Sequence, residues 1–262
     1  MLTFIHDKEE LKKFFDIILP PLNNEEVYFV SMSARNKQLT EDERLFYDLG
    51  RTEMFERKII REKDWMNFFR TIRKFEMHEE GITGRLGVPL PPHCLILYLN
   101  INPCNMIMAW RKFQDEMTEN VFNLVSGRGS DPAFFKRMNR LMMNAVQTSK
   151  GTKHYIDIDI DFIDKEKASS YEFVNLFTKE FADRGVEYFV VSTKGGFHIL
   201  LKKSTLKFNY NELVENWNQP GPVYGIKEVT VNKNDMIPIP GTLQAGYPVT
   251  VWWEMSNYKE KD

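Results

Sequence analysis

Cysteine is scarce in this sequence, because Cys94 and Cys104 are the only two among 262 residues. Two thiols cannot supply the four ligands of a zinc ribbon, and they are too few for a disulfide-based scaffold. The sequence therefore predicts a protein of a reducing compartment. We expect the cytoplasm, or the host cytoplasm if a virus or mobile element encodes the chain.

Long hydrophobic runs are also missing. The first residues, MLTFIHDKEELKKFF, lack a basic segment followed by an uninterrupted apolar stretch. No segment elsewhere approaches the roughly 18 apolar residues of a membrane span. We therefore expect a chain that is neither secreted nor membrane-spanning. The formal net charge is −2 at pH 7, so any nucleic-acid site has to come from a local basic patch.

Hydrophobic residues make up 42% of the chain, which is enough for a substantial core in one large or two small domains. The pattern of elements predicts an α/β (α+β) protein. A helix-rich N-terminal module, residues 1–150, is expected to pack on a C-terminal module, residues 151–262. No linker rich in Pro, Gly or Ser separates the two, so we expect one compact unit.

Capping residues and periodicity predict the elements. Side chains that can cap a helix precede amphipathic runs at Asp7, Thr40 and Asp64. Further helices are predicted over 105–125, from Asp131 and Pro132, and over 169–183, where Ser169 and Glu172 form a capping box and Gly185 ends the helix. Strands are predicted at 27–33, 95–101, 154–162, 186–192 and 197–203. The last three strands and the helix between them form a β-α-β-β unit.

The segment KHYIDIDIDFID, residues 153–164, places Asp157, Asp159 and Asp161 at alternating positions in an otherwise apolar stretch. In a strand, the three carboxylates project from one face and the isoleucines from the other. Successive carboxylates then lie about 6 to 7 Å apart and raise one another's pKa unless a cation neutralises them. A divalent metal is the simplest such cation. A calcium-binding EF-hand is excluded, because its sixth and twelfth positions would be Phe162 and Ala168.

The segment STKGGFHILLKK, residues 192–203, joins the next two strands through Gly195 and Gly196. Glycines let backbone amides approach a phosphate, and Ser192, Lys194 and His198 could supply a hydroxyl and cationic donors beside it. A plain hairpin turn is the simpler interpretation of the two glycines alone. The position of this segment after the acidic strand favours a cradle for a triphosphate.

These motifs together resemble the archaeo-eukaryotic primase superfamily, in which an hhhDhD/E strand, an S-x-H-type motif and an hD/Eh strand follow one another. Here YIDIDIDF resembles the first motif, STKGGFH a longer form of the second, and IKEVTVNK, with Glu228, the third. The resemblance covers roughly residues 151 to 250. It implies an RRM-like β-α-β-β catalytic module and a DNA primase or primase-polymerase that joins NTPs or dNTPs on a single-stranded DNA template.

The resemblance also implies site residues and cofactors. Two Mg²⁺ or Mn²⁺ ions would be held by Glu228 and by acids of the first strand, and two ions about 3.5 to 4 Å apart can stabilise both the attacking and the leaving oxygen. The family has two acids on that strand, so one alignment selects Asp157 and Asp159 and another selects Asp159 and Asp161. Ser192, Lys194 and His198 would contact the triphosphate.

Other features bear on partners. Residues 237–248, IPIPGTLQAGYP, are expected to neighbour the site, and a replicative helicase or an accessory subunit is a further candidate partner. Basic residues that could follow a phosphate backbone are Arg128, Arg137, Arg140, Lys150, Lys153, Lys227 and Lys233. We regard Arg35 and Lys37 as members of a solvated loop.

Two alternatives to a primase remain. A metal-dependent nuclease could use the same acids, but it would have little use for a triphosphate cradle. A non-catalytic replication factor could bind nucleic acid through the sheet, and it would bind a template without Mg²⁺ or Mn²⁺. The acidic sheet face argues against simple RNA binding, which relies on stacking aromatic residues.

Overall fold

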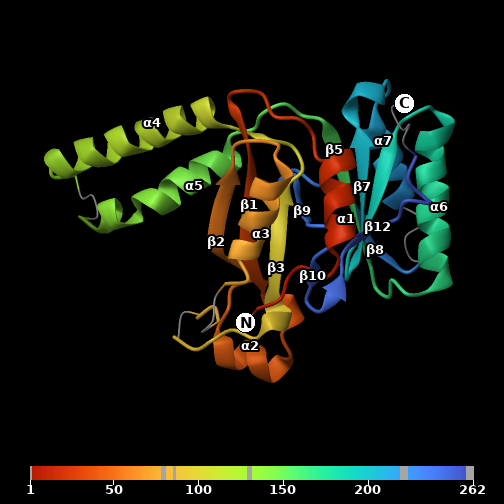
Figure 1. Ribbon diagram of the computed structural model, residues 1–262, viewed down its shortest axis with the longest axis horizontal. Helices are drawn as coiled ribbons and strands as arrows, with labels where there is room; N and C mark the ends of the chain where they lie inside the picture. The colour runs from red at the N-terminus through yellow and green to blue at the C-terminus, as the bar shows by residue number, and fades with distance from the viewer. Residues whose placement is uncertain (1, 78–80, 85–86, 129–131, 219–223, 258–262) are drawn as a thin grey trace.

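The computed structural model describes residues 2–77, 81–84, 87–128, 132–218 and 224–257. It contains two larger antiparallel sheets and helices packed around them (Figure 1). We call them the N-terminal sheet, with strand order β2-β1-β3-β9 and β4 added on β1, and the C-terminal sheet, with strand order β12-β6-β7-β5-β8. In the described ranges, no helix is both long and apolar enough to span a membrane.

The N-terminal sheet is built mainly from the first third of the chain. Its strands are β1 (Glu26–Arg35), β2 (Thr52–Ile60), β3 (Leu95–Asn100), β4 (Cys104–Asn105) and β9 (Met236–Pro238). The helical segments of this half are α1 (Lys8–Lys13), η1 (Phe14–Ile18), η2 (Asn36–Gln38), α2 (Glu41–Tyr47), α3 (Trp65–Lys74), η3 (Pro92–Cys94), α4 (Met106–Val125), η4 (Pro132–Arg137) and α5 (Met138–Thr148).

These segments confirm the expectation of a helix-rich N-terminal half, although β1 and β2 also form a long antiparallel ladder. The strand β2 was not predicted from the sequence. Most of its residues are only half-buried, so it lacks the strict apolar alternation that identifies a strand. The expected strands at 27–33 and 95–101 are present as β1 and β3.

The C-terminal sheet has helices on one face. Its strands are β5 (Tyr155–Phe162), β6 (Tyr188–Ser192), β7 (Gly196–Lys202), β8 (Ile226–Val231) and β12 (Thr250–Val251), and β10 (Leu243–Gln244) pairs with β11 (Tyr247–Pro248) beside it. The helical segments are α6 (Ala168–Asp183), η5 (Lys203–Thr205) and α7 (Tyr210–Asn218). Phenylalanines of α6 pack on Ile158 and Ile160 of β5, which fixes the isoleucine face towards the helices.

Side-chain caps start most of the predicted helices. The Asp7 carboxylate accepts hydrogen bonds from two amides of α1, Thr40 forms a capping box with Glu43 at α2, and Asp64 caps α3. The capping box predicted for Ser169 and Glu172 is wrong. The helix α6 begins at Ala168, after Lys167, and has no side-chain cap. The predicted cap at Asp131 lies outside the described residues.

The two sheets share a core. Buried residues of α1 and η1 contact both the N-terminal sheet and the face of the C-terminal sheet that is not covered by α6 and α7, and Figure 1 shows α1 between the sheets. The strand β9 pairs with β3 although it comes late in the chain. Residues 151–262 therefore supply one strand, β9, to the N-terminal sheet.

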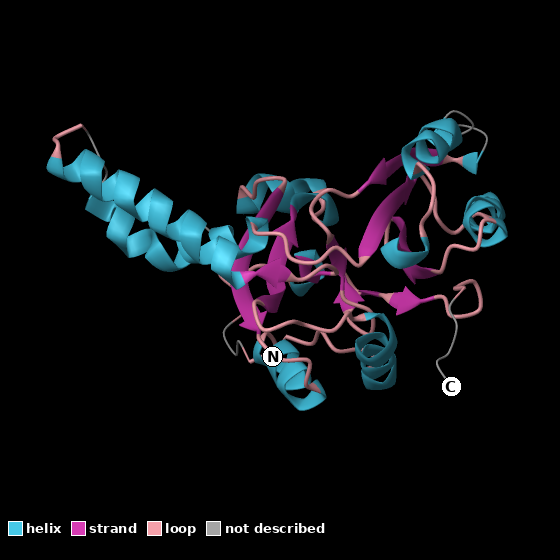
Figure 2. Ribbon diagram, turned by 90° about the horizontal axis from the view of Figure 1, so that it is seen from above, coloured by secondary structure: helices cyan, strands magenta, loops and turns pink. Residues whose placement is uncertain are grey.

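A helical hairpin of α4 and α5 extends away from the two sheets (Figures 1 and 2). Its base is anchored by a small core in which Ala109, Phe113 and Val146 pack on Phe29 of β1. The Asn105 side chain caps α4 by accepting a hydrogen bond from the amide of Met108 at 2.8 Å.

Candidate active site

Three carboxylates lie in a row on β5, the strand between β7 and β8. The alternation seen in the sequence is preserved, so Asp157, Asp159 and Asp161 share the sheet face opposite α6, which we call the acid face. Their exposures differ. Asp157 is fully buried, whereas the Asp159 side chain is 36% exposed and Asp161 is half-buried.

Asp157 is enclosed by hydrogen-bond donors. His198 of β7 places Nδ1 3.0 Å from Oδ1 and 3.2 Å from Oδ2 of Asp157. The Asn232 side chain donates from Nδ2 to Oδ2 at 2.7 Å, and the Asn232 amide donates to the Asp157 carbonyl at 2.8 Å. Asn232 directly follows β8 and was not predicted as a site residue. Because these groups satisfy both of its oxygens, Asp157 is a support for His198 and is less suited to binding a metal.

His198 carries a proton on both ring nitrogens at neutral pH. Burial alone would lower the pKa of the imidazole, but the negative charges of Asp157 and Asp159 outweigh burial and raise the pKa to about 9. An ionised carboxylate only accepts hydrogen bonds, so Nδ1–H must donate to Asp157. The second nitrogen, Nε2, lies 3.8 Å from Oδ1 of Asp159. His198 therefore presents an N–H beside the more exposed carboxylates.

Asp159, Asp161 and Glu228 form the accessible acidic group. Glu228 lies directly opposite Asp161 in the β5–β8 ladder, and an irregularity of register next to this pair leaves both Lys227 and Glu228 exposed. Such bulges re-aim side chains at the end of a ladder. Burial raises the pKa of Asp159, and the charges of Asp157 and Asp161 add to the increase, whereas His198 opposes it.

Whether Asp159, Asp161 and Glu228 suit a metal ion depends on the ligand atoms that they offer and on how these atoms are placed. In the described ranges, no three His, Cys, Asp or Glu side chains stand close enough together to form a metal centre without moving. The accessible donors are nevertheless all carboxylate oxygens, the ligands that Mg²⁺ and Mn²⁺ prefer. A divalent cation would offset both the burial and the repulsion from Asp157 and Asp161 that raise the pKa of Asp159. The chemistry of these donors therefore suits such an ion, although the described side chains do not converge on one point.

The glycine turn lies at the Asp161 end of the acid face. The Gly195 carbonyl accepts a hydrogen bond from the Phe162 amide at 3.0 Å. A side chain at Gly195 would begin 3.3 Å from Oδ1 of Asp161 and 3.9 Å from Nζ of Lys37. The space above Gly195 is thus bordered by a carboxylate and an ammonium group. Gly196 has a different role, since a Cβ there would lie 1.8 Å from the Ile160 carbonyl oxygen.

Ser192 is the one predicted triphosphate contact that the structure contradicts. It pairs with Phe197, so it lies on the α6 side of the sheet and not on the acid face. Its hydroxyl is buried and accepts a hydrogen bond from Lys165 Nζ at 2.9 Å. The even spacing between Ser192 and His198 would place both on one face only in a continuous strand. The turn reverses the chain and separates them.

Lys165 was missed by the sequence analysis. Its ammonium group is buried and also donates to the Thr193 carbonyl and the Tyr247 hydroxyl, both at 2.6 Å. It thereby links the start of α6 to the glycine turn and to β11. Lys194 is exposed, and its amide donates to Gln244 at 2.7 Å. This bond confirms that residues 237–248 lie beside the turn.

Basic residues of the N-terminal sheet face the acids. Lys37 is exposed, and partial desolvation lowers the pKa of its ammonium group while the charges of Asp161 and Asp159 oppose that effect. Arg35 donates from Nη1 to the Tyr98 hydroxyl at 2.9 Å, and its buried Nε has no hydrogen-bond partner among the described residues. The interpretation as a solvated loop is wrong for Arg35, which ends β1 and is half-buried, whereas Lys37 is exposed in η2. No local pattern reveals their position, because only the packing of the two sheets creates it.

The remaining basic residues predicted to follow a phosphate backbone are dispersed. Lys150 and Lys153 both approach Asp235, and Arg128 lies over the Phe122 ring at the end of α4. Lys227 is exposed next to Glu228. The positive charge near the acids thus comes mainly from Lys37, Arg35, Lys227 and His198.

Comparison with known proteins finds no relative. No protein-family model matches the chain, no curated protein matches it, and no solved structure matches it. The function must therefore be inferred from the site itself.

Proposed function

We propose that this protein is a nucleotidyltransferase that acts as a DNA primase or primase-polymerase, and that it belongs to the archaeo-eukaryotic primase superfamily. One observation carries the proposal. Carboxylates of Asp159, Asp161 and Glu228 share a sheet face with the doubly protonated imidazole of His198, beside a glycine turn. Oxygen ligands for divalent ions and a cationic donor for phosphate are the groups that nucleotidyl transfer requires.

Strand order gives further support. The succession β5-α6-β6-β7-α7-β8, with spatial order β6-β7-β5-β8, supports a split β-α-β module of the RRM-like kind. The acids lie on the central strand β5 and on its neighbour β8. An RRM-like module with carboxylates where RNA-binding proteins carry aromatic residues is suited to binding metal and nucleotide rather than stacked bases.

Asp159, Asp161 and Glu228 would hold two Mg²⁺ or Mn²⁺ ions. When bound, these ions supply Lewis-acid stabilisation of charge on the attacking and leaving oxygens. Asp157 takes no direct part, because its oxygens are already bonded to His198 and Asn232. Its negative charge keeps His198 protonated instead.

The triphosphate would be bound by the cationic side of the site. His198 would donate from Nε2, and Lys37 and Lys194 would attract the phosphates beside the glycine turn. Arg35 has a buried N–H without a partner in the described part of the chain, which an oxygen of the nucleotide could satisfy. The substrates would be NTPs or dNTPs and a single-stranded DNA template, in the cytoplasm, with a helicase or accessory subunit as a further partner.

The proposal is tested by primer synthesis on single-stranded DNA with labelled NTPs or dNTPs in Mg²⁺ or Mn²⁺. We expect template-dependent oligomers from the wild type and from Glu172→Gln, a control in which an exposed carboxylate of α6 is removed. Asp159→Asn should lose at least about a hundredfold in rate, as expected when a group acting on transition-state charge is lost. Product of equal yield from wild type and Asp159→Asn would refute the proposal.

Nucleotide binding separates the alternatives. In Mn²⁺, His198→Gln and Lys37→Met should each weaken binding of a non-hydrolysable nucleoside triphosphate, whereas Lys207→Met, at an exposed lysine elsewhere, should not. Metal-dependent cleavage of DNA without triphosphate binding would instead indicate a nuclease. Template binding that is unchanged in EDTA, with neither synthesis nor cleavage, would indicate a non-catalytic binding factor.

A further inference from the structure

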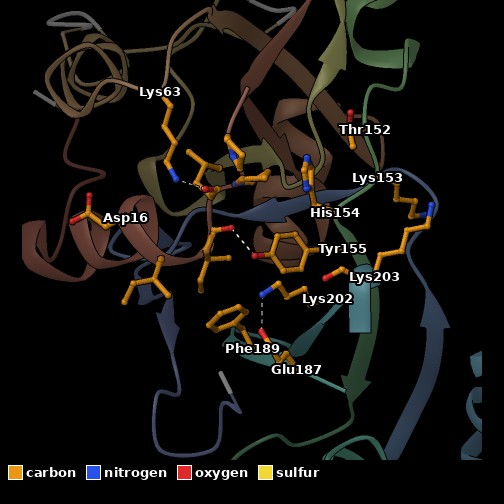
Figure 3. A pocket seen from close by; sticks show the side chains of 16 residues that line it. Asp16, Lys63, Thr152, Lys153, His154, Tyr155, Glu187, Phe189, Lys202 and Lys203 are labelled. Carbon is orange, nitrogen blue, oxygen red and sulfur yellow. Dashed lines mark hydrogen bonds and ion pairs between the residues drawn. The ribbon is translucent and has the colours of Figure 1, made fainter. Parts of the chain in front are cut away.

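A cavity lies on the same sheet face as the acids but at the other end of β5, where η1 and the following loop meet the C-terminal sheet (Figure 3). Its volume is about 860 Å³, within the range of about 300 to 1,000 Å³ that is usual for small-molecule sites. Residues 16–21 form one wall, and the opposite wall comes from the start of β5, from β6 and from the end of β7. We call it the inter-sheet pocket.

The inter-sheet pocket is separate from the acids. Tyr155, at its edge, is four residues before Asp159 on β5, which corresponds to about 13 Å along a strand. Asp157 and its cross-strand neighbour Leu200 lie between them, and both are fully buried. A ligand in the pocket therefore cannot occupy the proposed catalytic site as well.

Lysines dominate the charge of the pocket. Lys63, Lys153, Lys202 and Lys203 line it, against the two carboxylates of Asp16 and Glu187. Figure 3 shows Lys63 on one side of the cavity and Lys202 with Glu187 on the other. The Lys202 ammonium is 2.6 Å from Glu187, which neutralises one carboxylate, and Lys203 is exposed at the edge. Lys63 donates to the Leu19 carbonyl and Lys153 lies 3.8 Å from Asp235, so the exposed Lys203 is the lysine best placed to bind an anion such as phosphate.

The same cavity has an apolar and aromatic part. Phe189 and Tyr155 pack edge to face, with ring centroids 6.3 Å apart, and Ile18 and Leu19 face them. The Tyr155 hydroxyl is already used, because it donates to the Ile18 carbonyl at 2.8 Å. Tyr155 is 5% exposed and Phe189 is 4% exposed, so this part of the wall offers narrow apolar ring edges, against which a planar aromatic group can pack.

We propose that the inter-sheet pocket binds a nucleoside phosphate, with the phosphate among the lysines and the base against Phe189 and Tyr155. This inference does not depend on the proposed nucleotidyl transfer. The nucleoside phosphate could be either a free mononucleotide or the 5′-phosphorylated end of a nucleic-acid strand. The position about 13 Å from Asp159 excludes the pocket as the site of the nucleotide being added.

The test measures binding of fluorescent N-methylanthraniloyl-AMP by polarisation in EDTA, where no divalent ion can recruit nucleotide to the acids. We expect saturable binding by the wild type and by Asp159→Asn. Lys203→Glu should weaken it by about tenfold, the effect of losing one charge-assisted hydrogen bond. Ser204→Trp, which inserts a large side chain at an exposed lining residue, should abolish it. Lys207→Glu, an exposed charge reversal outside the lining, should leave binding unchanged.

Competition distinguishes the two sources. Displacement by AMP more readily than by a 5′-phosphorylated trinucleotide indicates a free nucleotide, and the reverse order indicates a strand end. Thermal unfolding of each variant confirms that it is folded. The proposal is overturned if the wild type does not bind the probe in EDTA, or if folded Lys203→Glu and Ser204→Trp variants bind it as tightly as the wild type.

Discussion

His198 and Asp157 form a buried ion pair across β7 and β5, with Nδ1 of the imidazole 3.0 Å from Oδ1 of the carboxylate. Asp157 therefore supports the histidine, whereas the other two acids of β5, Asp159 and Asp161, remain accessible. The pair also explains how a buried histidine can remain charged, because the adjacent carboxylates outweigh the effect of burial on its pKa.

The first prediction concerns which acids bind metal. Asp159→Asn and Asp161→Asn should each weaken Mn²⁺ binding, measured by titration calorimetry, by at least about tenfold, since each removes a charged oxygen ligand. Asp157→Asn should retain Mn²⁺ affinity within about threefold, because Asp157 is occupied by His198 and Asn232. A larger loss of Mn²⁺ affinity in Asp157→Asn than in Asp161→Asn would show that Asp157, and not Asp161, binds the metal.

The second prediction concerns pH and folding stability in EDTA. The pKa of His198 is about 9 in the folded protein and about 6.5 when unfolded. The raised pKa means that the ion pair stabilises the fold fully below about pH 6.5, and that this contribution is lost as pH rises through about 9. The difference between the free energy of unfolding of the wild type and that of His198→Gln should therefore decrease as pH rises from about 6.5 to about 9. A difference that is constant from pH 6 to 10 would contradict a charged His198.

Lys165 provides the third prediction, which concerns the free energy of unfolding. Lys165→Met should lower it by about 2 to 4 kcal/mol, because the buried Ser192 hydroxyl and Thr193 carbonyl lose their donor. Lys167→Met is the matched control, since Lys167 is exposed and its side chain makes no cap hydrogen bond to α6. Urea denaturation of both variants provides the measurement. Equal stability of the two would mean that Lys165 does not hold the turn.

The fourth prediction contrasts two adjacent glycines. Gly196→Ala should destabilise the protein by more than about 3 kcal/mol, because the new Cβ would lie 1.8 Å from the Ile160 carbonyl oxygen. Gly195→Ala places its Cβ 3.3 Å from Asp161 Oδ1, so it should fold but bind Mn²⁺ more weakly. Thermal unfolding and Mn²⁺ titration distinguish the effects. A stable Gly196→Ala protein would refute the close approach of β7 to β5.

Local sequence determined several features of this protein. Alternation of acid and isoleucine placed Asp157, Asp159 and Asp161 on one sheet face, because side chains in a strand alternate regardless of what surrounds it. The caps at Asp7, Thr40 and Asp64 were equally local, since a cap and the amides it satisfies lie within four residues. The choice of Glu228 as a partner of these acids came from the order of the motifs in the resemblance and not from a local pattern.

Tertiary structure decided the rest. The pairing of Ser192 with Phe197 moved that hydroxyl to the helix side, and packing of the two sheets brought Lys37 towards Asp161. Tertiary packing also added β9 to the edge of the N-terminal sheet, where its partner β3 lies more than a hundred residues earlier in the chain. Sequence spacing fixes which face of a strand a residue occupies, but only the packing of distant segments fixes what lies opposite that face.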